Sequence, residues 1–475
     1  MGKYARLGKN VFWMFIGNMG SKILTFLMLP FYTSHLSVGD YGTVDLIQVY
    51  VTLLTGLVTC CLTEAIFVFP KGQSLLKQRN YFTSGLVFSL SALLLTGGIF
   101  VFLLIVLHKL SYDGIFVKYN TYIFLIICVT FLQSYTQQFA RSIDKIKVYV
   151  SSGVVLTLTT VLTSLIFLPL WGVEGYIYSL ILSYLVAAIY TIVVGKEYLF
   201  FSLKCLSKQR LDEMLKYSIP MIPNSIMWWV LSTLNRPLLE YYSGIDAVGI
   251  LAVANKFPMV MSVIYSVFAY SWQISVLEEF KNMGYKNFYN RVFRLLFFVL
   301  ICFLLVITLF GRSLVKLMAE SSYYDAWQYI AVLSLAVIFS NLSGFIGTNF
   351  IATKESKYYF STSVWGGLLC LTLNFLLIPI WNIWGAVISI FLSNLLMLLL
   401  RAKITWKYTP IYNCRLYLLT LLGVIGYMGI NQIEDNLCLN ILCALMLLGG
   451  IIFLNGKFLI EILSVFKNVI KNRIG

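Results

Sequence analysis

The sequence predicts an all-α polytopic membrane protein of about 14 transmembrane helices, built from two six-helix lobes and two further helices. Of its 475 residues, 60% are hydrophobic and 11% are charged, whereas a soluble chain carries about 25% charged residues. Apolar stretches recur from residue 11 to residue 455 with only short polar gaps between them. These gaps leave no room for an independent soluble catalytic domain.

Each apolar stretch is assigned to a helix of about 20 residues, the length that crosses a hydrocarbon core of about 30 Å. The first stretch is too long for a signal peptide and no small-residue cleavage site follows it, so we expect it to stay in the membrane. The expected helices span residues 11–32, 42–69, 81–107, 121–140, 148–168, 174–194, 217–235, 247–271, 292–310, 327–352, 358–378, 384–400, 416–431 and 437–455.

Lysine and arginine indicate the orientation of these helices. Of the 35 basic residues, 28 lie in or beside the two termini and every second loop. The remaining loops hold Lys109, Lys118, Arg236, Arg312 and Lys316. The positive-inside rule therefore places both termini in the cytoplasm. The net charge of +16 reflects this topology and does not indicate nucleic-acid binding, because the basic residues form no dense patch.

An internal repeat divides the chain into two halves. The segment LPLWGVEGYIYSLILS at 168–183 resembles IPIWNIWGAVISIFLS at 378–393, and a weaker match, with a slightly shorter offset, pairs Gly42 with Gly249. Because matching segments face the same membrane side, we expect the halves to be related by an axis along the membrane normal. The expected domains are a six-helix lobe at 1–200, a second at 201–410, and two extra helices with a basic amphipathic tail at 411–475.

Several segments resemble one known family. They are LKYSIPMIPNSIMWWVLSTLNRPLLEYYSGIDAVGILAVANKF at 215–257, LSVGDYGTVDL at 36–46, ARSIDKIKVY at 140–149, YYDAWQYIAVLSLA at 323–336, FIATKESKYY at 350–359 and LNFLLIPIWNIWGAVISIFLS at 373–393. These segments are similar to the polysaccharide transporter branch of the multidrug/oligosaccharidyl-lipid/polysaccharide exporter superfamily, the Wzx-type flippases. The resemblance covers essentially the whole chain, although no single motif in it is diagnostic.

The resemblance implies a flippase of the cell inner membrane. Such proteins move undecaprenyl-pyrophosphate-linked oligosaccharide repeat units from the cytoplasmic to the outer leaflet for O-antigen, capsule or exopolysaccharide biosynthesis. It implies membrane lipids and other polysaccharide assembly proteins as partners, no cofactor, and coupling to an ion or proton gradient. One departure is local: the family commonly has an Asp-Arg pair at the outer end of the seventh helix, where this chain has Asn235 and Arg236.

Three basic residues are candidates for binding the pyrophosphate. An isolated ion is costly in a hydrocarbon layer, so the protein must supply a polar and preferably cationic passage. Lys22 and Lys256 lie near the middle of their expected helices, and Arg236 lies at the outer mouth. The alternative for Lys22 is an ion pair with Asp45 or Glu64; for Lys256 it is a bond to helix-end carbonyls. For Arg236 the alternative is a loop ion pair with Glu240.

Acidic and amide side chains complete the candidate site. Asp45 and Glu64 are candidate proton or cation sites, because acids inside a membrane are commonly functional. Asn224 and Asn255 are candidate hydrogen-bonding partners of the substrate, with helix-to-helix bonding as the alternative. Trp228 is one of several aromatic residues that could stack against sugar faces, although packing is the simpler interpretation.

Other activities have less support in the sequence. It contains no nucleophile motif, glycine-rich phosphate loop or Walker sequence, so we expect neither an enzyme nor an ATP-driven pump. The nine cysteines include no metal-binding spacing. Two alternatives keep the fold and change the cargo: a lipid II flippase or a multidrug exporter. A membrane-embedded glycan polymerase or ligase is disfavoured, since the outer loops are short.

Overall fold

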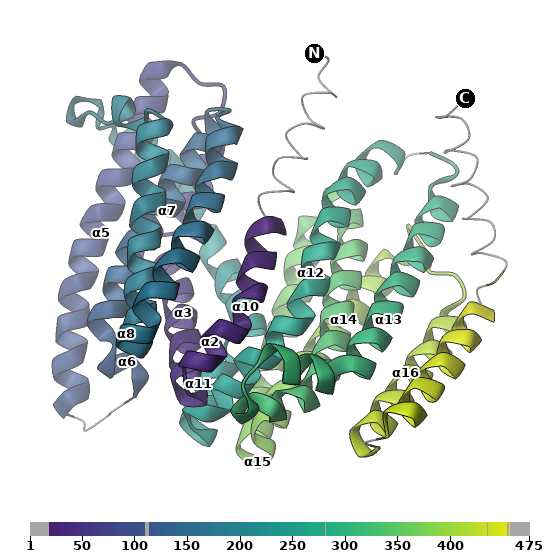
Figure 1. Cartoon of the computed structure of the whole chain (residues 1–475). Coiled ribbons are helices and arrows are strands. Elements are labelled where there is room, and N and C mark those ends of the chain that lie inside the picture. The colour runs from purple at the N-terminus through teal and green to yellow at the C-terminus, as the bar shows by residue number, and fades with distance from the viewer. Residues whose placement is uncertain (1–18, 110–113, 281, 435, 454–455, 457–475) are drawn as a thin grey trace, which may run out of the picture.

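The computed structural model describes residues 19–109, 114–280, 282–434, 436–453 and 456, and every structural statement below refers to these residues. Their regular elements are all helical. In Figure 1, α5, α7 and α8 form one group and α12, α13, α14 and α16 form another, with α3, α10 and α11 between them. The predicted all-α membrane fold is confirmed.

The first half contains the elements up to α8. Residues 19–27 are helical, and after them come α2 (Leu29–His35), α3 (Val38–Val58), α4 (Leu62–Val68), α5 (Leu75–Lys109), α6 (Ile115–Lys118), α7 (Asn120–Ser142) and α8 (Ile146–Val194). A capping box starts α3: the Ser37 hydroxyl accepts from the Asp40 N–H, and the Asp40 carboxylate accepts from the Ser37 N–H.

The second half repeats this order after a short connection. The connection holds η1 (Glu197–Phe200) and η2 (Leu203–Cys205), and the helices that follow are α9 (Lys208–Ser218), η3 (Ile219–Met221), α10 (Ile222–Ser232), α11 (Asn235–Ser243), α12 (Ile245–Glu279), α13 (Tyr285–Met318), η4 (Ser321–Ala326), α14 (Trp327–Ala352), α15 (Ser356–Thr405) and α16 (Cys414–Ile433). A further apolar helix spans Leu437–Phe453.

Three of the expected helices are interrupted among the described residues. In the first, expected at 11–32, a turn at Met28 separates the helix at 19–27 from α2. The helix expected at 42–69 consists of α3 and α4, because Cys60 and Cys61 adopt positive φ angles of 51° and 52° between them. The helix expected at 217–235 is broken into the end of α9, the turn η3 and α10, and Pro220 and Pro223 lie at the starts of the last two. Proline lacks an N–H and begins helices more readily than it continues them.

The remaining expected helices correspond to observed ones. The helix expected at 327–352 coincides with α14, and α5, α7, α12, α13 and α16 extend past their expected bounds. Parts of the first and last expected helices, and the amphipathic tail, lie outside the described residues. The expected total of about 14 spans and the lobe boundaries at 200 and 410 remain predictions.

The pairs of helices expected at 148–168 and 174–194, and at 358–378 and 384–400, are each observed as two helices that fold back on each other at a sharp kink, within α8 and α15. The Thr191 hydroxyl donates to the Ser152 hydroxyl at 2.7 Å, and the Arg401 Nε donates to the Thr362 hydroxyl at 3.1 Å, so the two arms of each element lie side by side.

In α8 the kink is at Gly172, with φ 55° and ψ −127°. In α15 it is at Asn382, with φ 50° and ψ −124°. The two kinks occupy equivalent positions of the sequence repeat. A Cβ at Gly175 or at its equivalent Gly385 would collide with a backbone carbonyl across the kink, which accounts for both glycines.

The two halves meet where α3 and α12 cross. These helices begin at Val38 and Ile245, which are equivalent positions of the weaker repeat match. A Cβ on Gly42 would lie 2.8 Å from the backbone nitrogen of Gly249, and these two glycines are themselves equivalent. Two residues that a twofold rotation exchanges are in contact with each other only close to the rotation axis. The contact is therefore where a rotation relating the two halves would place it.

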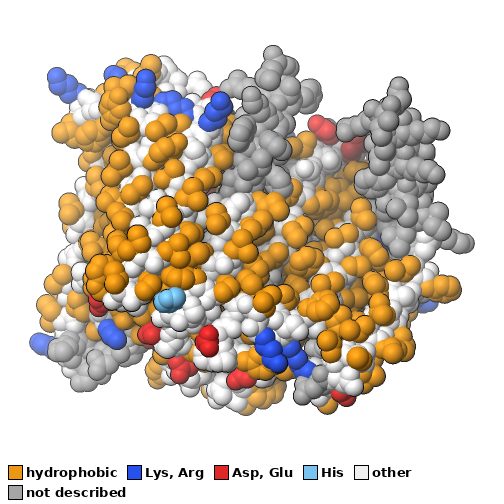
Figure 2. All heavy atoms as spheres, in the orientation of Figure 1, with side chains coloured by type: hydrophobic (Ala, Val, Ile, Leu, Met, Phe, Trp, Pro, Cys, Tyr) orange, Lys and Arg blue, Asp and Glu red, His pale blue; other side chains and the backbone are white. Residues whose placement is uncertain are grey.

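The surface is that of a membrane protein. Nine helical elements among the described residues are long and apolar enough to cross a bilayer, with α8 and α15 each counted once although each holds two helices. Figure 2 shows a broad hydrophobic band around the middle of one face, with charged side chains above and below it. Exposing an apolar surface of this extent to water would be unfavourable. The hydrophobic band is therefore suited to contact with membrane lipid.

Candidate functional site

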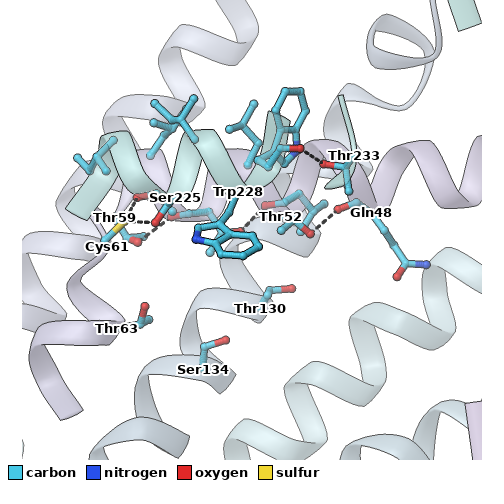
Figure 3. Close-up of a pocket in the computed structure, with 18 of the residues that line it drawn as sticks. Gln48, Thr52, Thr59, Cys61, Thr63, Thr130, Ser134, Ser225, Trp228 and Thr233 are labelled. Carbon is cyan, nitrogen blue, oxygen red and sulfur yellow. Dashed lines mark hydrogen bonds between the residues drawn. The ribbon is translucent and has the colours of Figure 1, made fainter. Parts of the chain in front are cut away.

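A pocket of about 490 Å³ lies between the first half and α10. Helices α3, α4, α7 and α8 form its walls, and α10, from the second half, closes it. Hydroxyl and amide groups dominate its polar lining: Gln48, Thr52, Thr55, Thr59, Thr63, Thr130, Ser134, Tyr184, Asn224, Ser225, Ser232 and Thr233. We call this the hydroxyl pocket (Figure 3).

The wall formed by α3 follows from helical spacing. Gln48, Thr52, Thr55 and Thr59 recur every three or four residues and so lie on one helix face. The Thr52 hydroxyl donates to the Gln48 carbonyl at 2.8 Å, and the Thr55 hydroxyl donates to the Val51 carbonyl at 2.7 Å. With their protons used in this way, these hydroxyl oxygens face the pocket as acceptors.

Two contacts hold α10 against the first half. The Trp229 indole N–H donates to the Val49 carbonyl at 3.1 Å. At the break between α3 and α4, the Cys61 Sγ lies 3.7 Å from the Ser225 hydroxyl. The neighbouring residue, Trp228, lines the pocket and is 37% exposed. Figure 3 shows Thr130 and Ser134 of α7 across the pocket from this ring.

The charge of the hydroxyl pocket differs from the expected cationic passage. Glu64 is its one charged lining residue among those described, and the described lining includes no lysine or arginine. The pocket combines an aromatic face with many neutral hydrogen-bonding groups. Such a surface can bind a neutral polar group with apolar faces, as a sugar has, and a single cation beside Glu64.

Lys22 and Lys256 lie outside the hydroxyl pocket, on two helices that contact each other. The helix at 19–27 contacts α12 through Phe26 and Phe257, whose ring centroids are 5.8 Å apart. Lys22 is one turn from Phe26 and is exposed, whereas Lys256, next to Phe257, is half-buried. The Lys256 ammonium lies 6.0 Å from the centroid of the Tyr41 ring. The structure thus brings both lysines to one helix contact, but neither lines the hydroxyl pocket.

Arg236 pairs with Asp45 and not with Glu240. Its Nε donates to the Asp45 carboxylate at 3.0 Å, and its NH1 donates to the Ser232 carbonyl at 2.6 Å and to the Asn235 side-chain oxygen at 3.0 Å. The Glu240 carboxylate instead accepts from the Tyr50 hydroxyl at 3.3 Å and from the Ile115 N–H at 2.9 Å.

These bonds join the two halves at one end of the molecule. α11 contributes Arg236 and Glu240, and α3 and α6 of the first half contribute their partners. Tyr323 of η4 adds a hydroxyl that donates to the Leu36 and Ser37 carbonyls, each at 2.8 Å. We call this set of contacts the outer closure, after the side of the membrane on which the basic loops predict this end to lie.

The two candidate amides have different positions. Asn224 lines the hydroxyl pocket. Asn255 donates to the Leu251 carbonyl of its own helix at 2.8 Å, so one of its donors is already used. The sequence interpretation did not identify the threonine face of α3, although its spacing was readable, and it did not identify Tyr323, whose partners are 286 and 287 residues away. Among the described residues, no cluster of His, Cys, Asp or Glu could hold a metal ion.

Comparison with known proteins gives one family and one fold. The family model described as "Polysaccharide biosynthesis protein" matches residues 7–272. No curated protein matches the chain. The solved structure "Lipid II flippase MurJ, inward closed conformation" is similar with a TM-score of 0.70 at 12% identity, over 95% of this chain and 99% of that one.

Two further solved structures share the fold. An inward-facing multidrug resistance MATE family transporter of the MOP superfamily is similar with a TM-score of 0.63 at 13% identity, over 88% of this chain and 96% of that one. A MOP superfamily transporter from Pyrococcus furiosus has a TM-score of 0.53 at 15% identity, over 84% and 96% of the two chains. At these identities the likeness shows the fold alone, and it is the fold that the sequence resemblance implied.

Proposed function

Because the chain belongs to the polysaccharide biosynthesis protein family and has the fold of MOP superfamily transporters, we propose that it is a flippase for lipid-linked glycans. Its substrate would be an undecaprenyl-pyrophosphate-linked oligosaccharide repeat unit, moved from the cytoplasmic to the outer leaflet of the inner membrane. Both termini would lie in the cytoplasm, as the distribution of basic residues indicates.

The observation that carries this proposal is the hydroxyl pocket. A sugar chain can leave water only where its hydroxyl groups find replacement hydrogen bonds. The pocket offers them at the junction of the two halves, where repeat-built transporters commonly bind their cargo. Trp228 adds an aromatic face for the apolar side of a sugar ring. Asn224 is proposed as a further partner for the glycan.

The pyrophosphate would bind elsewhere, at the contact between helix 19–27 and α12. Lys22 and Lys256 flank this contact, and a phosphate group is stabilised by ammonium groups in a medium of low dielectric. Asn255 precedes Lys256 and has a second amide hydrogen to donate. Arg236 would join them only after the outer closure opens, since Asp45 neutralises its charge in this structure.

Coupling to an ion gradient is proposed at Glu64 and Asp45. Glu64 lines the hydroxyl pocket, where a proton or cation could exchange with the cargo. Asp45 holds the outer closure through Arg236, so its protonation would weaken that contact. Flipping measured with and without proton and sodium gradients tests this coupling; equal rates in all gradients would remove it.

A second candidate function is export of organic cations. Glu64 is the one charged residue among the described residues of the pocket lining, and a carboxylate there would attract a cationic cargo. A lipid II flippase is a further alternative with the same pocket chemistry. Twelve described hydroxyl, phenol and amide residues against one carboxylate favour a glycan.

Binding of a short-chain substrate analogue tests the glycan assignment. A farnesyl-pyrophosphate-linked oligosaccharide is titrated into the purified chain, and Trp228→Ala is expected to weaken binding about tenfold, in line with the loss of one aromatic stacking contact. Trp365→Ala is the matched control, because Trp365 is 58% exposed on α15 and does not line the pocket.

The lysines are tested with the same titration. Lys22→Gln and Lys256→Gln should weaken binding of the pyrophosphate-linked analogue and leave binding of an uncharged prenyl oligosaccharide unchanged. Unaltered affinity in both lysine variants would contradict the pyrophosphate assignment. Equal losses for Trp228→Ala and Trp365→Ala would contradict the glycan assignment of the pocket.

A further inference from the structure

The connection between the two halves, residues 195–207, carries an apolar surface that the other described residues leave uncovered. It contains η1 and η2. Its large apolar side chains that are 44–63% exposed belong to Tyr198, Leu199, Phe201, Leu203 and Leu206. Exposing so many large apolar residues of one short segment to water would be unfavourable. The surface of this connection is therefore suited to an apolar environment.

The backbone of the connection is fixed to the first half. The Thr83 hydroxyl of α5 donates to the Phe200 carbonyl at 3.2 Å and accepts from the Ser202 N–H at 3.2 Å. The Ser84 hydroxyl, also on α5, accepts from the Ser207 N–H at 2.8 Å. Hydrogen bonds at both ends of the exposed stretch thus hold its backbone in one position. The protein presents this apolar surface in a defined arrangement.

The apolar surface of the connection continues that of the adjoining helix ends. Val193 and Val194, the last residues of α8, are 57% and 50% exposed. η2 packs on α5, whose first residues, Leu75 and Leu76, are 61% and 63% exposed. Apolar side chains exposed on membrane helices contact lipid. The connection therefore lies where two lipid-facing helices end, at the level of the membrane interface.

The exposed charges of the connection and of the residue after it are all positive. Lys196, Lys204 and Lys208 are exposed, whereas the one acid, Glu197, is fully buried. Figure 2 shows basic side chains gathered at the upper left edge, directly beside the hydrophobic band. A lysine stem can lie along apolar surface while its ammonium reaches the lipid headgroups. Exposed apolar and cationic side chains together are complementary to an anionic membrane surface.

We propose that residues 195–208 form an interfacial anchor that inserts its apolar side chains into the cytoplasmic leaflet and binds anionic phospholipid headgroups through its lysines. The leaflet follows from the orientation that the basic loops predict. Through the hydrogen bonds to α5, the anchor would hold the cytoplasmic end of the first half in this leaflet. The anchor requires no glycan. A chain that enriches anionic lipid here without flipping a glycan would overturn the flippase function alone, and the reverse result would overturn the anchor alone.

Photocrosslinking of the full chain in nanodiscs tests the anchor. The discs hold equal amounts of phosphatidylglycerol and phosphatidylcholine, with a trace of one lipid in a photoactivatable form that reacts near the glycerol backbone. Peptides from 195–208 should be labelled about fivefold more by the phosphatidylglycerol probe. Lys204→Gln with Lys208→Gln should bring this ratio close to one. The control Lys357→Gln with Lys403→Gln removes two exposed charges of α15 and should leave the ratio unchanged.

A second pair of variants tests the apolar contact. Leu203→Ser with Leu206→Ser should lower labelling of 195–208 by both probes about fivefold, because the segment loses apolar area that it buries in lipid. Leu94→Ser is the control, since Leu94 is 78% exposed in the middle of α5 and should leave this labelling unchanged.

Several results would overturn the anchor. They are labelling confined to other peptides, equal labelling of 195–208 by the two probes, an unchanged ratio in the variant of Lys204 and Lys208, and an equal loss in either control. Modification of 195–208 by a water-soluble, membrane-impermeant reagent to the same extent in nanodiscs as in detergent would also overturn it, because the segment would then lie in water. If a variant does not fold, the wild-type ratio decides, and a ratio of one contradicts the proposal.

Discussion

The two halves of the molecule repeat their backbone and differ in their charges. Asp144 and Lys354 share a left-handed conformation, with φ angles of 61° and 59°, and the next residues, Lys145 and Glu355, are the N-caps of α8 and α15. Just after the last residues of α8 and α15, Glu197 in the first half corresponds to Lys407 in the second. The offset of the sequence repeat relates each pair, so a lysine and a glutamate have exchanged places.

The exchange has different consequences in the two halves. Lys407 and Glu355 form an ion pair of 3.5 Å with the lysine side chain 51% exposed. Glu197 is fully buried, neither of its carboxylate oxygens has a hydrogen-bond partner among the described residues, and the Lys145 ammonium donates to the Gly195 carbonyl instead. The repeat therefore preserves turns and helix ends, while side-chain chemistry at equivalent positions has diverged.

At the outer closure, too, equivalent positions of the two halves carry different side chains. Among the predictions, substitution of Asp45 has the largest expected effect on stability. In the weaker repeat match, Asp45 and Arg236 correspond to Ala252 and Leu29, which are both buried and apolar. Asp45→Ala leaves a largely buried guanidinium without its anion, so we expect a loss of about 2–3 kcal/mol in unfolding free energy. Denaturant unfolding in detergent measures it.

A double-mutant cycle separates the ion pair from the loss of the side chain. Asp45→Ala with Arg236→Ala should recover part of the stability lost in Asp45→Ala, because no unpaired charge is left. Additive losses in the double variant would show that the pair contributes no coupling across the outer closure.

The two kinks give the next largest effect. Gly172 and Asn382 share a backbone conformation that side chains rarely adopt. We expect Gly172→Ala to cost about 1–3 kcal/mol, and Asn382→Gly to be more stable than Asn382→Ala by about 1 kcal/mol. Both Asn382 variants lose the hydrogen bond from Ser243, so their difference isolates the backbone strain. Gly98→Ala, at an unstrained and open position of α5, should not destabilise.

Glu197 provides a smaller, pH-dependent effect. Burial raises the pKa of this carboxyl from 4.5 to about 9, and Lys145 offsets only part of that rise. The folded state therefore favours the protonated acid, and the stability it contributes below pH 4.5 is lost as the pH rises towards 9. We expect Glu197→Gln to unfold at a higher temperature than wild type at pH 8 and at the same temperature near pH 4.5.

Lys407→Gln is the matched control at the equivalent exposed position. We expect no measurable change in its unfolding temperature at either pH, because an exposed ion pair contributes little. A pH-dependent shift in Lys407→Gln as large as that in Glu197→Gln would contradict the contrast between the buried and the exposed pair.

Helices and repeat were readable from the sequence because they depend on local patterns. Apolar runs of the length of a bilayer predict spans, and the two matching Pro-x-Trp segments predict equivalent turns between helices, which lie at Gly172 and Asn382. The break at Cys60 and Cys61 was not readable, since cysteine has no preference for the left-handed conformation found there. Asp45 was a candidate acid in the sequence, yet nothing local indicated that it would pair with Arg236.

The candidate site was less predictable because it depends on which helix faces meet. The lysines were identified by their depth in expected helices, yet they lie beside Phe26 and Phe257 and outside the hydroxyl pocket. Arg236 had an acid four residues away and one 191 residues away, and it binds the distant one. Sequence spacing cannot rank such partners, since the choice depends on the crossing of α3 and α11.

The central claim is that the chain moves a lipid-linked glycan across a bilayer, and reconstitution tests it most directly. Full-length protein is placed in vesicles whose two leaflets hold undecaprenyl-pyrophosphate-linked oligosaccharide with a fluorescent sugar, and an impermeant reagent quenches the outer half. We predict that the inner half becomes quenchable within the assay and that Lys256→Gln slows this about tenfold, a barrier increase of about 1.4 kcal/mol. An inner half that stays as protected as in protein-free vesicles would contradict the proposed function.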